Sequence, residues 1–555
     1  MKIKTTLFIF LSLGSALSWA QTNPLGFEMN LAGNFGELRP NHFHAGIDIK
    51  TKQSIGHDVY SFADGYIDRV AINAKGYGLV VYVTHPKIER MTVYAHLSDF
   101  SPAIWEKLKE RQVAEELNNA DVFFKPEEIP VKQGEMIAKS GNSGSSGGPH
   151  VHFEVRGLMS APGADDEEWY DPITYFQDSI KDTTTPRIFN IFIYKYPNTP
   201  YTFSTQILNR IATAWGKVGF GIKANDYMDK QGNTFGVKRV RLFCDNKLIY
   251  SWSNDFFRYD ETRYINSLID YKLYSSKWIT VMKTYVEPNN KLRTIDHSLG
   301  DGIVDINEER NYKMHYEVED AHGNVKSINF TIKGVKQQPR THKPKGFLVK
   351  ADQDFKIDTL GFSFSIPKGN LYCDADLEFS VINSNNGKNL SKIYNFGTKT
   401  VPLHDFCELR ITLPDTLTNG DKLYVADIEG GIYKAEYLAP YTTPLGSTVL
   451  SPVLKTKVRT FGSFVVRKDN TPPSIVTVGK QSSNYIRLRI GDTESGVSGW
   501  KVYIDGKFVP CDKDNHGRII GYPTKYGIEK GKHEVEVHAY DLLMNEKIHR
   551  FKIYN

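Results

Sequence analysis

Apolar and polar residues alternate in short runs along most of this chain of 555 residues, a pattern typical of β-strands. The stretch 150–155 shows it most clearly, because three apolar residues alternate there with His150, His152 and Glu154. Side chains alternate across a strand, so this spacing predicts both imidazoles on one face and the apolar side chains on the other. Long helical patterns are nearly absent after residue 176, so we expect a mostly β protein.

Other histidines stand in patterns that also suit a metal site. His44 precedes Asp48 by four residues, and Gly46 marks a turn before the predicted strand 47–49, so His44 can fold back toward Asp48. A further predicted strand ends at His96. Imidazoles and carboxylates are common zinc ligands, and a catalytic zinc keeps a fourth position for water. An exposed His-x-His on an edge strand is the alternative for 150–152 alone, but the combination of motifs favours a metal site.

The order of these motifs resembles that of the lysostaphin-type (LytM-like, M23) zinc endopeptidases, with H-x-x-x-D, then Y-x-H-L, then H-x-H-F-E. The likeness covers about residues 26–176, and we place the domain at 25–178. It implies that His44, Asp48 and His152 are the zinc ligands, and that His96 and His150 are the catalytic pair beside the metal. It also implies an antiparallel β catalytic domain with Zn²⁺ on the floor of a groove.

One segment departs from the family pattern. Between residues 101 and 130, where the family has a short connection, this chain has a charged stretch with helix-like spacing. We expect an insertion beside the groove that shapes substrate choice or partly covers the site.

The resemblance implies an exported zinc metalloendopeptidase whose substrate is a peptide cross-link in peptidoglycan. Two alternatives stay open. The first is a non-catalytic LytM-like adaptor that activates cell-wall hydrolases, although the complete set of metal-site residues argues against it. The second is a peptidase that acts on another exported protein, with protein partners bound by the carboxy-terminal domains.

Two later regions look like copies of one another, at 180–335 and 468–555. The segment 182–188 matches 469–475, and 318–324 matches 539–545. Each copy has a proline-marked entry, a strand with a hairpin turn, and a closing strand, which predicts two immunoglobulin-like β-sandwiches. Between them, at 345–466, lies a β-rich region that weakly resembles ZU5-type domains.

Acidic residues in these copies, among them Asp320, Asp492 and Glu494, permit a calcium interpretation. Turn formation and interdomain hydrogen bonds are commoner roles, so we expect those instead. The four cysteines are too few for a disulfide scaffold. Cys373 and Cys407 fall in one predicted domain and could pair, whereas Cys244 and Cys511 are expected to be free thiols.

Residues 1–20 have the features of a cleaved signal peptide, with a positive start, a short apolar core and small residues before the cut. We therefore expect a periplasmic or secreted protein, with no transmembrane segment after cleavage. The formal net charge of +5 comes from 69 basic and 64 acidic residues, and loss of Lys2 and Lys4 leaves +3. Such a balance does not predict nucleic-acid binding, although a mildly basic surface suits an anionic wall polymer.

Overall fold

The computed structural model describes residues 21–159, 167–195, 204–229, 232–337, 343–384, 386–442, 448–449, 451–514 and 516–554. The predicted signal peptide lies outside the described residues. Strands dominate the described chain, which confirms the prediction of a mostly β fold. Its longest described helix, α1 (Pro102–Ala114), lies where the alternating pattern breaks. Within these ranges no helix is long and apolar enough to span a membrane.

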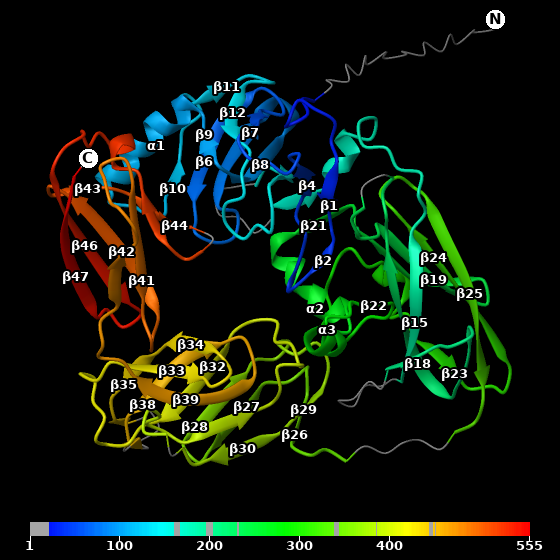
Figure 1. Ribbon diagram of the computed structural model, residues 1–555. Helices are drawn as coiled ribbons and strands as arrows, with labels where there is room; N and C mark the ends of the chain where they lie inside the picture. Colours follow the sequence, from blue (N-terminus) through cyan, green and yellow to red (C-terminus); the bar gives the residue numbers. More distant parts are fainter. Residues whose placement is uncertain are drawn as a thin grey trace, which may run out of the picture.

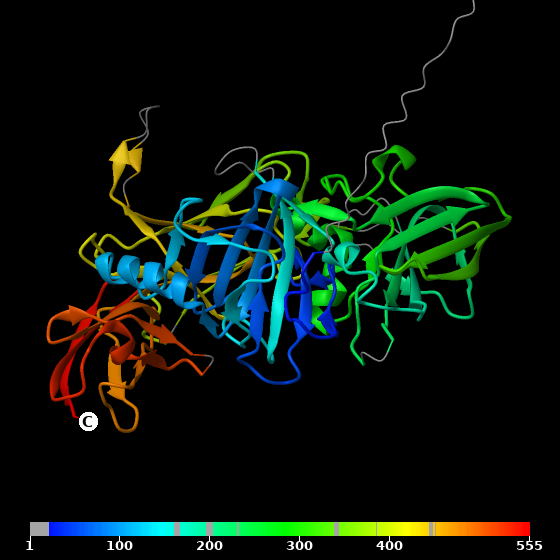
Figure 2. The same ribbon diagram turned by 90° about the horizontal axis from the view of Figure 1, so that it is seen from above.

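Four packed units follow one another in the described part of the chain, each around its own hydrophobic core. We name them the first (21–180), second (181–337), third (343–468) and fourth unit (469–554). They are arranged around a ring, so that the fourth unit, orange to red, returns to the first (Figure 1). The view from above also places α1 beside the fourth unit (Figure 2).

The first unit is built on a sheet with the strand order β1-β4-β13-β8-β7-β6-β10, to which β11 and β14 are added at β6 and β13. A smaller sheet, β5-β12-β9, shares its core through Val59, Phe100 and Ile137. The short strands β2 and β3 form a separate hairpin, which we call the β2–β3 hairpin (38–43). The bounds are β1 (Leu31–Gly33), β2 (Leu38–Arg39), β3 (His42–Phe43), β4 (Ile47–Lys50), β5 (Asp58–Tyr60), β6 (Gly65–Ile72), β7 (Leu79–His85), β8 (Arg90–Leu97), β9 (Asp99–Phe100), β10 (Asp121–Phe123), β11 (Pro130–Val131), β12 (Met136–Lys139), β13 (His150–Gly157) and β14 (Glu168–Tyr170).

The second unit packs one sheet, β16-β15-β18-β22 with β23, against another, β17-β25-β24-β19-β20. Its strand β21 pairs with β14 and so extends the sheet of the first unit. Two facing sheets agree with a sandwich, and the immunoglobulin-like assignment stays a prediction. The bounds are β15 (Arg187–Lys195), β16 (Ser204–Gln206), β17 (Ile211–Ala214), β18 (Gly216–Asn225), β19 (Arg239–Cys244), β20 (Lys247–Ser253), β21 (Phe256–Arg258), α2 (Ile265–Leu268), α3 (Tyr271–Lys277), β22 (Met282–Lys283), β23 (Val304–Ile306), β24 (Asn311–Glu319) and β25 (Val325–Gly334).

The third unit contains the sheets β27-β28-β32-β38-β35 and β30-β31-β39-β33-β34, with the pairs β26-β29 and β36-β37 beside them. The bounds are β26 (Phe347–Val349), β27 (Phe355–Thr359), β28 (Phe362–Ile366), β29 (Ala375–Leu377), β30 (Phe379–Ile382), β31 (Ile393–Phe396), β32 (Cys407–Thr412), β33 (Leu423–Asp427), β34 (Gly431–Lys434), β35 (Glu436–Leu438), β36 (Tyr441–Thr442), β37 (Thr448–Val449), β38 (Val453–Val458) and β39 (Gly462–Lys468).

The fourth unit pairs the sheet β40-β41-β45-β44 with the sheet β43-β42-β46-β47. The bounds are β40 (Ser474–Thr477), β41 (Ile486–Gly491), β42 (Val497–Ile504), β43 (Lys507–Phe508), β44 (Cys511–Lys513), β45 (Ile519–Gly521), β46 (His533–Asp541) and β47 (Glu546–Ile553).

Contacts between the fourth unit and the segment after α1 close the ring. Glu116 Oε2 accepts hydrogen bonds from Lys501 Nζ at 2.5 Å and from Tyr503 OH at 2.9 Å. Asn118 Oδ1 accepts a hydrogen bond from the Cys511 backbone N–H at 3.0 Å. The insertion that we expected beside the groove therefore also serves as a contact between the two ends of the chain.

All four cysteines are free thiols, so Cys373 and Cys407 are not paired. Cys407 is buried on β32, where its Sγ accepts a hydrogen bond from Asn370 Nδ2 at 3.2 Å. The Cys373 thiol lies instead beside Glu287 of the second unit. The two cysteines share a unit in the sequence, but their side chains have different neighbours in the fold.

Candidate metal centre

Three side chains of the first unit converge at one point, and all three are buried. His44 and Asp48 come from the approach to β4 and from β4 itself, and His152 comes from the neighbouring strand β13. His44 Nε2, Asp48 Oδ1 and His152 Nδ1 lie 2.8 to 3.1 Å from one another. The strand register causes this meeting, because β13 places His152 directly opposite Asp48.

The turn at Gly46 lets β4 approach β13 closely enough for this register. A Cβ atom at Gly46 would lie 2.2 Å from the backbone oxygen of Phe153, which is a severe clash. Only glycine fits at this point without a shift of the backbone. The local turn that the sequence predicts is therefore also a close contact between strands, which brings His44 over Asp48.

A hydrogen bond on the far side of each ring fixes the orientation of the two imidazoles. His44 Nδ1 lies 2.7 Å from the backbone oxygen of Asn34, and His152 Nε2 lies 2.8 Å from Glu154 Oε1. Both acceptors place the ring proton on those nitrogens. His44 Nε2 and His152 Nδ1 therefore face each other at 3.0 Å beside a carboxylate oxygen, where each can offer a lone pair to a metal that displaces any proton between them.

This donor set fits a zinc ion. Ligand atoms bound to tetrahedral Zn²⁺ at about 2.0–2.2 Å lie roughly 3.3 Å apart, close to the separations seen here. Burial alone would lower the pKa of His152, yet hydrogen bonds to Asp48 and Glu154 raise that pKa to about 9. The carboxylates thus favour a positive charge at the point where the three atoms meet.

Glu154 holds His152 in place, a role that the sequence analysis did not assign. Its fully buried carboxylate also accepts hydrogen bonds from Tyr77 OH at 2.5 Å, Trp169 Nε1 at 3.0 Å and Arg156 Nε at 2.6 Å. Burial would raise the pKa of Glu154, but Arg156 and these donors lower it to about 2. The signal in the sequence was a glutamate two residues after His152, on the same face of the strand.

Arg39 is a second residue that the sequence analysis missed. Its Nη2 donates to Asp48 Oδ2 at 2.7 Å and to Glu37 Oε2 at 3.1 Å. Asp48 can therefore offer Oδ1 to a metal while Oδ2 is held from outside. A Cβ atom at Gly33 would lie 2.8 Å from Arg39 Nη2, so the glycine leaves room for this ion pair.

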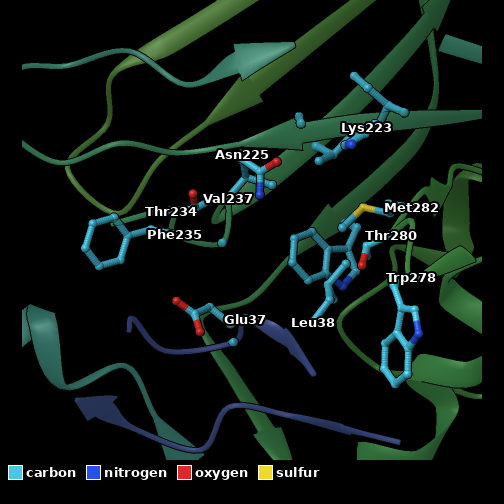
Figure 3. A pocket seen from close by; sticks show the side chains of 16 residues that line it. Glu37, Leu38, Lys223, Asn225, Thr234, Phe235, Val237, Trp278, Thr280 and Met282 are labelled. Atoms are coloured by element: carbon cyan, nitrogen blue, oxygen red, sulfur yellow. The ribbon is translucent and has the colours of Figure 1, made fainter. Parts of the chain in front are cut away.

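The second unit supports the β2–β3 hairpin that carries Arg39. Phe43 N donates to Thr262 Oγ1 at 2.9 Å, and Asn41 Oδ1 accepts from Asn266 Nδ2 at 3.1 Å. A cavity of about 290 Å³ lies between Glu37 and Leu38 on one side and second-unit residues that include Trp278 and Met282 on the other (Figure 3). The cavity belongs to the interface that positions the hairpin, because its lining comes from both units and includes none of the three converging side chains in the described structure.

His96 and His150 form a second pair beside the three converging side chains, with ring centroids 4.7 Å apart. His96 Nδ1 lies 2.8 Å from Ser143 O, and His150 Nδ1 lies 2.8 Å from Gly148 O. These carbonyls place the ring protons on Nδ1 and leave each Nε2 as an acceptor. His150 Nε2 points to Asp48 Oδ1 at 3.5 Å. Burial, together with His152 and His150, lowers the pKa of His96 to about 3, so this ring is neutral.

The backbone turns His96 toward the site. Its φ is +59°, a left-handed conformation that is unusual for a histidine and typical of strained functional positions. Tyr94, two residues earlier, points into the core instead, where it is fully buried and its hydroxyl accepts a hydrogen bond from Phe62 N at 2.8 Å. Strict alternation would have placed both side chains on one face, and the sequence alone did not reveal the change.

The structure brings together all five residues that the sequence analysis singled out: His44, Asp48, His96, His150 and His152. The sequence model described as Peptidase family M23 matches residues 42–117, which hold His44, Asp48 and His96. The amino-terminal unit contains a peptidase family M23 domain. His150 and His152 of the M23 domain lie beyond the matched segment and reach the site through β13.

Two curated relatives match a part of the chain. An "uncharacterized metalloprotease" of Haemophilus influenzae is 37% identical over 119 residues, which are 21% of this chain and 19% of that protein. A "DD-carboxypeptidase/endopeptidase Mpg" of Neisseria meningitidis is 32% identical over 136 residues, 24% of each chain. The chain thus spans about a fifth to a quarter of the length of these relatives.

Among solved structures, the catalytic domain of the antimicrobial peptidase lysostaphin from Staphylococcus simulans is 20% identical, with a TM-score of 0.19. The match covers 26% of this chain and 89% of that domain. A separate sequence model, described as a Zu5-like domain, matches residues 347–469, which form most of the third unit.

Proposed function

We propose that this protein is an exported zinc metalloendopeptidase that hydrolyses peptide cross-links of peptidoglycan. The observation that carries the proposal is the convergence of His44 Nε2, Asp48 Oδ1 and His152 Nδ1, with two further imidazoles beside them. A non-catalytic adaptor has no need for the pair His96 and His150. The resemblance to M23 enzymes and the complete site therefore support catalysis.

His44, Asp48 and His152 would hold the metal. When bound, zinc supplies a Lewis acid that lowers the pKa of a coordinated water toward neutrality and polarises the scissile carbonyl. Glu154 and the Asn34 carbonyl keep the two imidazoles oriented for this role. Arg39 holds the second oxygen of Asp48 and so limits how that carboxylate can turn.

His96 and His150 would handle the protons. As the water attacks the amide carbon, an Nε2 lone pair of this pair accepts the proton that the water loses. The protonated ring then donates it to the amine nitrogen as the peptide bond breaks. A ring that carries a proton also stabilises the negative charge on the former carbonyl oxygen. Both rings keep Nδ1 on a backbone carbonyl throughout, so they need not turn during the reaction.

The proposed substrate rests on the name of one relative and on the expected export of the chain. The Neisseria relative is named a DD-carboxypeptidase/endopeptidase. The predicted signal peptide at residues 1–20 would bring this chain to the same compartment as the wall.

Digestion of purified peptidoglycan by the mature, zinc-loaded chain tests the proposal, with mass spectrometry of the released peptides. Wild type should release peptides whose new ends name the bond, and His150→Ala should release none while keeping its zinc. An unfolded exported protein serves as a second substrate in parallel. Cleavage of that protein alone would overturn the peptidoglycan assignment, and cleavage of neither by zinc-loaded wild type would overturn the enzyme.

A further inference from the structure

A second group of ligand-type side chains lies at the junction of the first and second units. The carboxylates of Asp182 and Asp320 and the imidazole of His322 offer ligand atoms within 4.8 Å of one another. Asp182 opens the second unit, and Asp320 directly follows β24. His322 Nε2 lies 2.6 Å from the backbone oxygen of Ile180, whose side chain belongs to the core of the first unit. The group therefore touches both units.

Backbone donors satisfy only part of this group. Asp320 Oδ1 accepts from His322 N at 2.8 Å and Asn324 N at 2.9 Å, and Oδ2 accepts from Asn324 Nδ2 at 2.8 Å. Asp182 Oδ1 accepts from Thr184 N at 2.9 Å. Asp182 Oδ2 and His322 Nδ1 are buried and have no hydrogen-bond partner. One carboxylate oxygen and one imidazole nitrogen of this close group are therefore buried without a hydrogen-bond partner.

Asp226 adds the observation that points to a ligand. It is completely buried (0% exposed), and no side chain among the described residues donates a hydrogen bond to either carboxylate oxygen. Buried carboxylates are almost always paired, because an unpartnered one is costly. Asp226 directly follows β18, whose Asn225 pairs with Arg187 of β15, shortly after Asp182. Burial, then the negative charge of Asp320, raises the pKa of Asp226 to about 7, although a backbone hydrogen bond from Tyr227 opposes the shift. The Tyr227 N–H carries no net charge, so it does not neutralise the carboxylates.

The sequence repeat provides an internal comparison at the junction of the third and fourth units. Asp469 and Asp541 align with Asp182 and Asp320 in the matching segments. Asp492 takes the place of Asp226, because Gly491 pairs with Ser474 as Asn225 pairs with Arg187. The three carboxylates of this second copy form a close group. There, however, Asp469 Oδ2 accepts from Ser495 Oγ at 2.6 Å, and Asp492 Oδ1 accepts from Gly496 N at 2.7 Å. The residue equivalent to His322 is Leu543, which offers no ligand. The second copy satisfies its Asp492 carboxylate internally, and the first leaves that of Asp226 open.

We propose that Asp182, Asp226, Asp320 and His322 bind one oxygen-preferring divalent cation, which stabilises the second unit at the place where His322 contacts the first unit. Three carboxylates suit Ca²⁺ or Mn²⁺, and one imidazole is compatible with Mn²⁺. The cation neutralises the three buried negative charges that the described protein groups leave unpaired. It also holds the start of the second unit to the end of β24, where His322 Nε2 lies beside the Ile180 backbone oxygen.

Cation binding is measured on the full mature chain, with the M23 site first loaded with one equivalent of Zn²⁺. Equilibrium dialysis with CaCl₂ or MnCl₂ and elemental analysis should find one additional ion per wild-type chain and none in Asp226→Asn. Asp492→Asn is the matched control and should keep the additional ion. In wild type, saturating cation should raise the first unfolding temperature by about 5 °C.

The Asp226→Asn variant should fold without any cation, because the substitution removes a buried charge. Its unfolding temperature is expected to equal or exceed that of cation-free wild type and to stay constant on addition of CaCl₂ or MnCl₂. Equal binding of the additional ion by wild type and Asp226→Asn would overturn the proposal. The proposal would also be overturned if wild type bound no additional ion in CaCl₂ and none in MnCl₂. Asp226 would then simply be a protonated acid.

Discussion

The metal centre of the M23 domain and the junction group behind it are built from the same residue types in opposite ways. His44 and His152 are each held by a second partner that fixes where the ring proton lies, and Arg39 holds one oxygen of Asp48. At the junction, no described side chain donates a hydrogen bond to Asp226. Pre-oriented ligands beside an imidazole pair suit a reaction, whereas buried carboxylates without side-chain donors suit a cation that only holds structure.

Loss of one ligand should produce the largest difference between the metal centre and the junction group. His152→Ala removes one of three ligands and leaves Asp48 and His44 without their partner, so we expect zinc loss and a fall in turnover of more than about 10³-fold. His322→Ala, the matched change at the junction, should keep zinc and most of the activity. Elemental analysis and peptide release are measured on the same samples, and full zinc occupancy in His152→Ala would contradict the ligand assignment.

Within the M23 domain, His150→Ala should distinguish proton transfer from metal binding. We expect bound zinc at wild-type stoichiometry and turnover lower by about 10²–10⁴-fold, because the lost ring acts only on protons. His57→Ala serves as the control, since His57 contacts Ser54 outside the site and should change neither quantity. A His150→Ala enzyme with wild-type turnover would remove the ring from the mechanism.

Glu154→Gln should have a smaller effect that depends on zinc concentration. The amide keeps the shape but no longer fixes the proton on His152 Nε2, so zinc affinity should fall by about 10–100-fold. Turnover should return when zinc is raised to saturation, which a role in the chemical step would not allow. Competition with a chelator of known affinity measures the first quantity, and peptide release at rising zinc measures the second.

The smallest expected effect concerns Asp512, a carboxyl group of the fourth unit that serves as a control for Asp226 at the junction. Burial raises the pKa of this carboxyl to about 7, although nearby Lys525 opposes the shift, and Oδ1 has no hydrogen-bond partner. A folded-state pKa above the unfolded value means that stability is lost as pH rises from about 4 to 7. Calorimetry should show the fourth unit unfolding a few degrees lower at pH 7.5 than at pH 4.5.

Asp512→Asn should abolish this dependence of the unfolding temperature on pH. Because Asp512 lacks the acidic neighbours that surround Asp226, CaCl₂ should leave the transition of the fourth unit in place. If CaCl₂ raised the unfolding temperature of the fourth unit, a lone buried acid would respond to the cation as the proposed cation site does, and the two could not be told apart in this way.

Local patterns predicted much of the site. Alternation along β13 placed His150 and His152 on one face, and the turn at Gly46 brought His44 toward Asp48. The roles of Arg39 and Glu154 could not be read in the same way, because they depend on partners that other strands supply. The positive φ of His96 was hidden as well, since the conformation is imposed by the packing around it and not by a residue type.

The larger architecture shows the same limit. Short alternating runs predicted a mostly β chain, and the matching segments 182–188 and 469–475 indicated a repeat. The ring, however, depends on the contact of Glu116 with Lys501 and Tyr503, 385 and 387 residues away in the chain. Acidic residues were visible in both copies of the repeat, but the sequence did not show that they gather, and only the hydrogen bonds revealed how the two groups differ.

The most direct test of the account is a zinc titration of the metal-free mature chain, with peptide release from peptidoglycan measured at each step. The account predicts that wild-type activity rises linearly with bound zinc and stops at one equivalent, while His150→Ala binds the same zinc without gaining activity. Wild-type peptide release that is independent of zinc, or equal release by His150→Ala, would contradict it.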